Sequence, residues 1–237
     1  MAEELTRMKI LLGEERVALL AKKTVLIAGV GGVGSFVTEA LARSGVGRLI
    51  LVDSDEVEIS NLNRQLMSGY GNIGRPKVEV MKERIASYSR AAHVETRQLF
   101  IDDSFEIGEG VDYVADCIDT LAGKMALAEK THAAGIPLIS AMGAARRIST
   151  GELIITTLDK TSGDPLARKY RQLCRKRGFD ARNIRVVINT SPTLEYEAPA
   201  REEDTHTRTP LGSSIFPVGI LGLKIAEIIV NDLLEIK

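Results

Sequence analysis

The residues best able to do chemistry lie in the first half of the chain, in a fixed order. A glycine-rich turn comes first, and Asp53 follows at the end of the next apolar segment. Glycines permit a tight turn and let the backbone approach a phosphate, which the amides of the following helix then bind. Asp53 lies close to the spacing of about 20 residues that is typical of a ribose-binding acid. These residues predict a nucleotide site, and the glycines concerned are Gly29, Gly31, Gly32 and Gly34.

A second polar group follows, and a nicotinamide enzyme would have no need of it. Arg64 can bind a phosphate through two hydrogen bonds, and Lys77 can place a point charge on another. Asp119 is expected at the carboxyl end of a strand, where a carboxylate beside a triphosphate usually holds Mg²⁺. Such groups stabilise the charge that develops as pyrophosphate leaves, so they predict ATP-dependent activation. The alternative is a surface salt-bridge network. The other candidates are Asp55, Asn61, Asn63 and Gln65.

The elements that must position these residues alternate between strands and helices. Buried strands are expected over 24–28, 48–52, 94–99, 111–115 and 138–141, and helices over 13–21, 35–44, 77–86 and 122–134. This alternation predicts an α/β fold with a doubly wound, Rossmann-like, mostly parallel sheet.

The pattern changes after Gly143. We expect an antiparallel strand over 152–158, a basic helix over 166–177 and a further strand over 184–188, which form an antiparallel C-terminal extension. The polar segment 190–212 is interpreted as a mobile loop. We therefore expect a single domain over 1–237, with a nucleotide-binding half at 1–143 and a substrate and dimer half at 144–237.

Composition narrows the possible partners. The net charge is -1 and aromatic residues make up 4%, which argues against global attraction to nucleic acid and against base-stacking platforms. The N-terminus lacks the pattern of a signal peptide, and the apolar stretch from Ile215 to Val230 is shorter than the roughly 20 residues of a membrane span. We expect a cytoplasmic protein with no membrane association, and a buried or subunit-contacting helix over 215–230.

Together, the motifs resemble the ubiquitin-activating-like adenylyltransferases of the HesA/MoeB/ThiF type, from about Arg7 to Asp119. The resemblance implies that ATP and Mg²⁺ bind and that a substrate carboxylate attacks the α-phosphate, giving an acyl-adenylate. By the same resemblance Asp53 binds the ribose, Arg64 and Lys77 bind phosphates, and Asp119 binds the metal. Asn61 and Gln65 would orient neighbouring groups. Arg7 would reach the ATP site of the other subunit of a homodimer.

The cysteines distinguish branches of this family. Members that activate sulfur carriers usually have two CxxC pairs around zinc, and neither Cys117 nor Cys174 has such a partner. Conjugating members need a cysteine near the long loop, and 190–212 has none. Cys174 lies among arginines that could lower its pKa, so a catalytic role for it stays open beside that of an ordinary helix cysteine. Cys117 is expected in the core.

The form Asn61-Leu62-Asn63-Arg64-Gln65, together with Lys124 and Asp164-Pro165-Leu166, resembles the tRNA threonylcarbamoyladenosine dehydratase branch. The resemblance implies that ATP activates the carboxylate of the threonylcarbamoyl group. An internal atom of the same modification then attacks, releases AMP and closes a ring with net loss of water. Whether Lys124 replaces an arginine found in relatives stays open.

The segment from Arg168 to Arg185 is densely basic, with Asp180 as its one acid, and Arg146 and Arg147 add to it. It could bind tRNA phosphates, form an ordinary solvated helix face, or contact an acidic protein. The main alternative function is activation of the C-terminal glycine of a ubiquitin-like or sulfur-carrier protein. A non-catalytic nucleotide-binding module and a nicotinamide dehydrogenase leave the charged loop residues unexplained.

Overall fold

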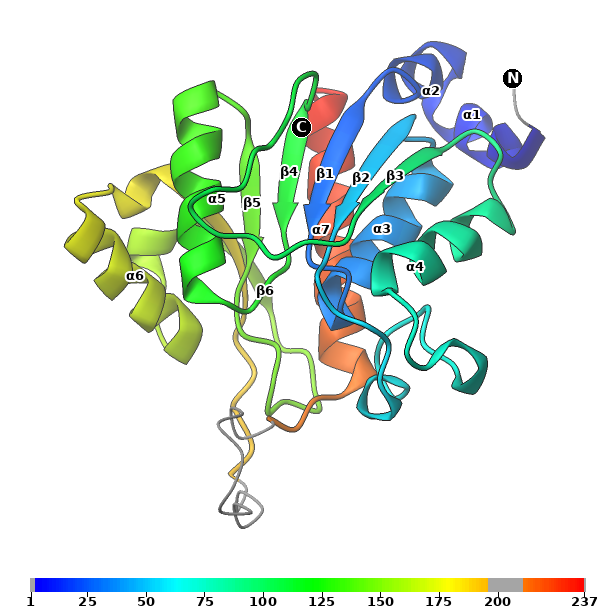
Figure 1. Ribbon diagram of the computed structural model, residues 1–237. Helices are drawn as coiled ribbons and strands as arrows, with labels where there is room; N and C mark the ends of the chain where they lie inside the picture. The colour runs from blue at the N-terminus through cyan, green and yellow to red at the C-terminus, as the bar shows by residue number, and fades with distance from the viewer. Residues whose placement is uncertain (1–2, 196–210, 237) are drawn as a thin grey trace.

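The computed structural model describes residues 3–195 and 211–236, and its centre is a seven-stranded sheet (Figure 1). The strands are β1 (Thr24–Ala28), β2 (Arg48–Val52), β3 (His93–Arg97), β4 (Tyr113–Asp116), β5 (Leu138–Ala141), β6 (Leu153–Thr157) and β7 (Arg185–Asn189). Their order is β3-β2-β1-β4-β5-β7-β6. Every neighbouring pair is parallel except β6 and β7, which are antiparallel. The prediction of a doubly wound, mostly parallel sheet with an antiparallel extension is therefore confirmed.

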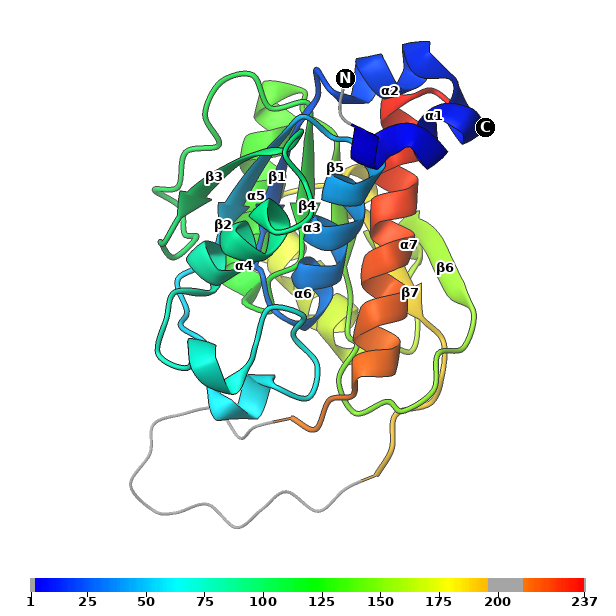
Figure 2. The same ribbon diagram turned by 90° about the vertical axis from the view of Figure 1, so that its right-hand side faces the viewer.

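Helices cover both faces of this sheet. They are α1 (Thr6–Leu12), α2 (Glu14–Leu20), α3 (Gly32–Ser44), α4 (Lys77–Ala86), α5 (Leu121–Ala134), α6 (Pro165–Arg177) and α7 (Ile215–Leu233). Figure 2 shows α3, α4 and α7 on one face of the sheet, with α5 and α6 on the other. Short 3-10 helices occur at Glu3–Leu5, Ile59–Asn61, Tyr70–Asn72, Leu158–Lys160 and Ala181–Asn183.

The central strands divide their side chains between two cores, because successive residues of a strand point to opposite faces. Val25 and Ile27 of β1 pack in the core beneath α3, α4 and α7. Leu26 and Ala28 of the same strand pack in the core beneath α5 and α6. Burial on both faces explains why this strand is a continuous apolar run and not an alternating one.

The sheet reverses its winding between β1 and β4. From β1 the chain proceeds to β2 and β3 on one side, and from β4 to β5 and β7 on the other. Ligands of such sheets bind outside the carboxyl ends of the strands at this switch point. In Figure 1 these carboxyl ends form the lower edge of the sheet, where α3 begins.

Most predicted elements are present, with shifted ends. The helix expected from residue 35 begins instead at Gly32, inside the glycine turn, and α1 was not expected. Part of the expected mobile loop, 196–210, lies outside the described residues. The expected helix at 215–230 is present as α7, which packs closely on α3. Among the described residues no helix has the length and apolarity needed to cross a membrane.

Candidate nucleotide site

Two glycines of the turn are required by the close packing of its own backbone. Gly29 has a φ of 85°, a region that L side chains rarely adopt, and a Cβ there would lie 2.9 Å from Ile118 Cγ2. A Cβ on Gly34 would lie 1.8 Å from the carbonyl oxygen of Gly29. The turn between β1 and α3 can therefore close only with glycine at both positions.

The other two glycines are not required by backbone packing, because a Cβ at either position would meet only side-chain atoms. Gly31 is the N-cap of α3, and the nearest atom to a Cβ built on it is Gln65 Nε2 at 3.8 Å. Gln65 is 6% exposed, and its Oε1 is buried without a hydrogen-bond partner. Backbone amides at a helix N-terminus can bind a phosphate, whereas the unsatisfied Gln65 Oε1 is an acceptor and suits a water molecule or a metal ion. Gly32 instead lies near Val218 of α7.

Asp53 ties the glycine turn to the loop that follows β2. Its Oδ2 accepts a hydrogen bond from the Val30 amide at 2.7 Å, and its Oδ1 accepts one from the Asp55 amide at 2.9 Å. Burial raises the pKa of the Asp53 carboxyl above its ordinary value, against the opposing charge of Lys77 and these two amides. The hydrogen bond from Val30 therefore places the Asp53 carboxylate beside the glycine turn that follows β1.

Lys77 is the first residue of α4 and is 6% exposed. Its Nζ donates to Oδ2 of Asp55 at 2.7 Å, while the Asp55 side chain is 64% exposed. A buried ammonium whose ion-pair partner is one exposed carboxylate is a strong local cation. An incoming phosphate would take the place of the exposed Asp55 as its partner.

The segment from Asn61 to Gln65 folds back over the start of α3. Asn61 is buried and closes a short 3-10 helix by accepting a hydrogen bond from the Glu58 amide at 3.1 Å. Asn63 Nδ2 donates to the carbonyl oxygen of Ser213 at 2.8 Å. One guanidinium nitrogen of Arg64 donates to the Ser60 carbonyl and the Asn63 side chain. Burial lowers the pKa of Arg64 from its ordinary value.

Asp119 lies on the coil between β4 and α5, and its side chain is exposed. It forms no hydrogen bond or ion pair with the described part of the chain. Residues 3–195 and 211–236 contain no group of three or more His, Cys, Asp or Glu side chains placed to hold a metal ion. A magnesium ion here would depend on Asp119, phosphate oxygens and water, an arrangement typical of Mg²⁺.

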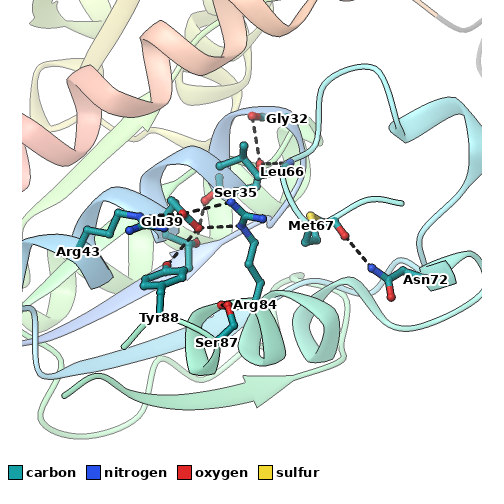
Figure 3. A network of polar contacts seen from close by, with 12 residues as sticks. Gly32, Ser35, Glu39, Arg43, Leu66, Met67, Asn72, Arg84, Ser87 and Tyr88 are labelled. Carbon is teal, nitrogen blue, oxygen red and sulfur yellow. Dashed lines mark hydrogen bonds and ion pairs between the residues drawn. The ribbon is translucent and has the colours of Figure 1, made fainter. Parts of the chain in front are cut away.

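A network of polar contacts joins α3, which begins in the glycine turn, to α4, which begins at Lys77, and Figure 3 shows it. Glu39 of α3 accepts hydrogen bonds from Arg84 of α4 at 2.9 Å and from Tyr88 at 3.1 Å. Arg43 also pairs with Glu39 and lies over the Tyr88 ring. Ser35 Oγ accepts a hydrogen bond from the Leu66 amide at 3.3 Å, which holds the Asn61–Gln65 segment on α3. Neither contact is predictable from local sequence patterns, because each joins residues far apart in the chain.

A buried ion pair lies behind the site. Lys124 and Asp116 have side chains that are 0% exposed, and Lys124 Nζ lies 3.1 Å from each carboxylate oxygen. The same ammonium donates to Ser140 Oγ at 3.0 Å and to the Ala141 carbonyl at 2.9 Å. Lys124 therefore links the carboxyl ends of β4 and β5.

Both cysteines are unsuited to a covalent role. Burial raises the pKa of Cys174 to about 11 and, together with the charge of Asp116, raises the pKa of Cys117 to about 12. The thiolate is the nucleophilic form, so neither group is activated at neutral pH. The arginines near Cys174 in the sequence do not lower its pKa, because the side chain faces the core beside Met125.

The remaining candidates lie apart from this site. Arg7 is exposed on α1, at the edge of the sheet opposite the carboxyl ends of β1 and β4 (Figure 1). The basic segment from Arg168 to Arg185 carries less unpaired positive charge than its sequence suggests, because several of its arginines form ion pairs. Arg177 pairs with Asp103 and Glu129, Arg182 with Asp180, and Arg185 with Asp232. Arg147 is buried at 5% exposure and does not belong to this surface.

Several known proteins resemble this chain along most of its length. The family model described as "ThiF family" matches residues 4–232. A tRNA threonylcarbamoyladenosine dehydratase of Bacillus subtilis is 36% identical over 245 residues, covering 99% of this chain and 96% of the relative. One of Escherichia coli is 38% identical over 169 residues, covering 68% of this chain and 62% of the relative. The crystal structure of E. coli tRNA N6-threonylcarbamoyladenosine dehydratase in complex with ATP superposes with a TM-score of 0.84 and 28% identity, covering 98% and 94% of the two chains.

Proposed function

The chain belongs to the ThiF family, and on that premise we propose that it is an ATP-dependent tRNA threonylcarbamoyladenosine dehydratase. The observation that carries the proposal is the match to a dehydratase along almost the whole of both chains. The site at the switch point supports it, because its glycine turn, acid and buried cations are suited to a nucleoside triphosphate.

The proposed residue roles follow from this arrangement. The amides at the start of α3 and the side chains of Arg64 and Lys77 bind the phosphates, and Asp53 binds the ribose. Asn61, Asn63 and Gln65 shape the loop around them. Asp55 holds Lys77 before the nucleotide arrives. Asp119 would hold Mg²⁺, which neutralises phosphate charge when it is bound.

The reaction needs two displacements. The carboxylate of the threonylcarbamoyl group attacks the α-phosphorus, and the bond to pyrophosphate breaks. An internal atom of the same modification then attacks the activated carbonyl, and AMP leaves with one oxygen of the former carboxylate. Loss of this oxygen and of protons from the modification amounts to loss of water. No enzyme thiol is required, which suits the raised pKa values of Cys117 and Cys174.

A tRNA substrate needs a cationic surface, and we assign this role to α6. Arg168 and Arg175 share one face of this helix, as do Lys169 and Lys176, because seven residues make nearly two turns. All four are exposed and form no ion pair with other described residues. A tRNA substrate is also the reason to propose a cytoplasmic location.

We also propose a homodimer in which α7 is part of the interface. Its buried face packs on α3, while its other face exposes apolar side chains: Ile215, Phe216, Ile220 and Leu223. Exposed apolar side chains gathered on one helix are typical of a protein interface. A second subunit could also bring Arg7 to the nucleotide site of its partner.

Sedimentation velocity tests this proposal: we expect a dimer for the wild type and a monomer for Ile220→Asp. A wild type that remains monomeric at micromolar concentration would contradict it.

The decisive experiment measures AMP and pyrophosphate release from Mg-ATP in the presence of tRNA with or without threonylcarbamoyladenosine. We expect AMP release only with the modified tRNA, accompanied by the mass loss of one water from the modified nucleoside. AMP release that does not depend on the modification would contradict the proposal. The next substrates to try would then be ubiquitin-like or sulfur-carrier proteins ending in glycine.

A further inference from the structure

The loop that follows β5 contains a residue with unusual backbone geometry. Arg146 has a φ of 60°, which is uncommon for a residue other than glycine. Its amide donates to the Gly212 carbonyl at 2.7 Å, and its carbonyl accepts from the Leu194 amide at 2.7 Å. Figure 1 shows this loop meeting the segment before α7 at the lower edge of the molecule. Such local strain is found mainly at functional sites, and here it fixes the direction of the next side chain.

That next side chain, Arg147, is a buried cation with spare donors. It is 5% exposed, and its Nε is buried with no hydrogen-bond partner. Its ion pair is with Asp164, at 4.0 Å. The Asp164 carboxylate already accepts hydrogen bonds from the Ala167 amide at 2.8 Å and the Gly143 amide at 3.1 Å. A buried donor without an acceptor is costly, so the Arg147 guanidinium, with one long ion pair and no acceptor for Nε, is suited to bind a further anion.

Arg147 lines a cavity of about 230 Å³ together with Ile148, Leu194, Ser213 and Ser214. The cavity lies next to the loop of the candidate nucleotide site, because Asn63, which precedes Arg64, donates to the carbonyl of the lining residue Ser213 at 2.8 Å. Pockets that enclose a whole drug-sized ligand measure about 300–1,000 Å³, so this one suits a substituent. Apolar and hydroxyl groups around one cation fit a short side chain that ends in a carboxylate.

We propose that Arg147 binds the carboxylate of the threonylcarbamoyl group and holds it beside the α-phosphate of ATP. This assignment rests on the proposed function. A guanidinium matches a carboxylate with two parallel hydrogen bonds, which fixes the direction of attack as well as the affinity. Holding the two reactants together removes much of the entropy cost of their encounter. Arg147 is therefore the residue that distinguishes modified from unmodified tRNA.

The test compares Arg147→Gln and Arg147→Lys with the wild type and with Arg90→Gln, which changes an exposed arginine. Fluorescence anisotropy gives the affinity for one tRNA with and without the modification, and the ratio of the two affinities is the readout. This ratio is insensitive to partial unfolding, because both affinities come from the same preparation. Calorimetric titration gives the affinity for ATP, and AMP release gives KM and kcat.

We expect the wild type and Arg90→Gln to bind the modified tRNA about 10-fold or more tightly than the unmodified tRNA, as for a hydrogen-bonded charged group. In Arg147→Gln the ratio should fall to about one, with KM for the modified tRNA raised and ATP affinity unchanged; Arg147→Lys should recover part of the ratio. An unchanged ratio in Arg147→Gln, a wild-type ratio near one, or a loss of ATP affinity would overturn the assignment. AMP release by the wild type that is independent of the modification would instead overturn the proposed function.

Discussion

Asp119 is exposed and forms no hydrogen bond or ion pair with other described residues, unlike Asp53, Arg64 and Lys77. Replacing it should therefore leave the fold intact. We expect Asp119→Asn to abolish ATP turnover while the thermal midpoint stays within about 1 °C, as for surface substitutions. Pyrophosphate release and differential scanning calorimetry measure the two effects, with Glu109→Gln as an exposed acidic control. Retained turnover in a folded variant would remove Asp119 from the metal role.

The buried pair of Lys124 and Asp116 should matter to stability. Removing one partner leaves an uncompensated charge, so Lys124→Met should lower the free energy of unfolding by about 3–5 kcal/mol. Urea unfolding at pH 7 measures this. In the control Lys130→Met, which breaks an ion pair with the exposed Glu106, the change should be about 1 kcal/mol or less. Adding Asp116→Asn to Lys124→Met should restore part of the loss, and no recovery would show that the pair is not the cause.

At the residue scale, the sequence predicted roles that depend on local spacing. Gly29, Gly34 and Asp53 lie where their pattern placed them, because turn geometry and strand ends are set by nearby residues. The role of Arg147 was not predicted, and the residue was grouped with the basic surface. The burial of Arg147 and the hydrogen bonds open to it depend on Asp164 and on strands that are distant in the chain. Residue spacing in the sequence does not reveal such contacts.

Among the elements, α7 is held against α3 by small residues. A Cβ on Gly222 would lie 2.6 Å from the carbonyl oxygen of Val33 and 2.7 Å from Phe36 Cβ, so the helices would have to separate. We expect Gly222→Ala to lower the free energy of unfolding by about 1–3 kcal/mol despite the better helix propensity of alanine. ATP affinity should fall too, because α3 begins at the glycine turn. Calorimetry and ATP titration test both effects.

Gly219→Ala is the matched comparison for this prediction. Its Cβ would lie 3.1 Å from the outer carbons of the Phe36 ring, and not against backbone. We therefore expect a smaller loss than for Gly222→Ala. Equal effects at the two positions would mean that close backbone approach is not what limits the packing of these helices.

The contact between α3 and α4 predicts a pH dependence. Burial raises the pKa of Glu39, but the hydrogen bonds from Arg84 and Arg43 outweigh this effect and lower the pKa below its ordinary 4.5. Just below pH 4.5 the unfolded state therefore binds more protons than the folded state. The stability contributed by Glu39 is complete above that pH and is lost as the pH falls through the lowered pKa.

We expect Glu39→Gln to lower the free energy of unfolding by about 1–3 kcal/mol at pH 7, because two arginines lose a charged acceptor. The difference from the wild type should shrink as the pH falls below 4.5. Urea unfolding at several pH values measures both effects, with the exposed Glu14→Gln as control. A difference that stays constant down to acid pH would contradict the role of Glu39.

Element boundaries were predicted best where the apolar pattern decides them. β1, β2, β5 and α4 begin and end as expected, because buried strands and a helix with one apolar face leave clear periodicity. The predicted start of α3 was wrong. Glycine disfavours helix in general, and here only the contacts of the turn favour a helical conformation at Gly32. α1 was not expected, and its residues carry no buried stripe.

For the whole molecule, the distribution of charge decides how tRNA would bind. Charge reversal at Arg175 and Lys176 should weaken tRNA binding about 10-fold or more and reduce its salt dependence, while ATP affinity is unchanged. Titrations at several salt concentrations test this. Reversal at the exposed Lys22 and Lys82 gives the same net charge and should have little effect. Equal losses in the two double variants would mean that net charge, and not α6, controls binding.

The backbone hydrogen bonds of Arg146 also affect how freely the segment between Leu194 and Gly212 can change in length. The backbone of this one residue holds both Leu194 and Gly212, so the two ends of the segment between them leave the scaffold at fixed points. A change in the number of residues between these two points would therefore not shift the pairing of the strands. Lengthening such a connection costs little entropy. A reporter domain inserted between Leu194 and Gly212 would therefore be attached through two residues that line the same cavity as Arg147.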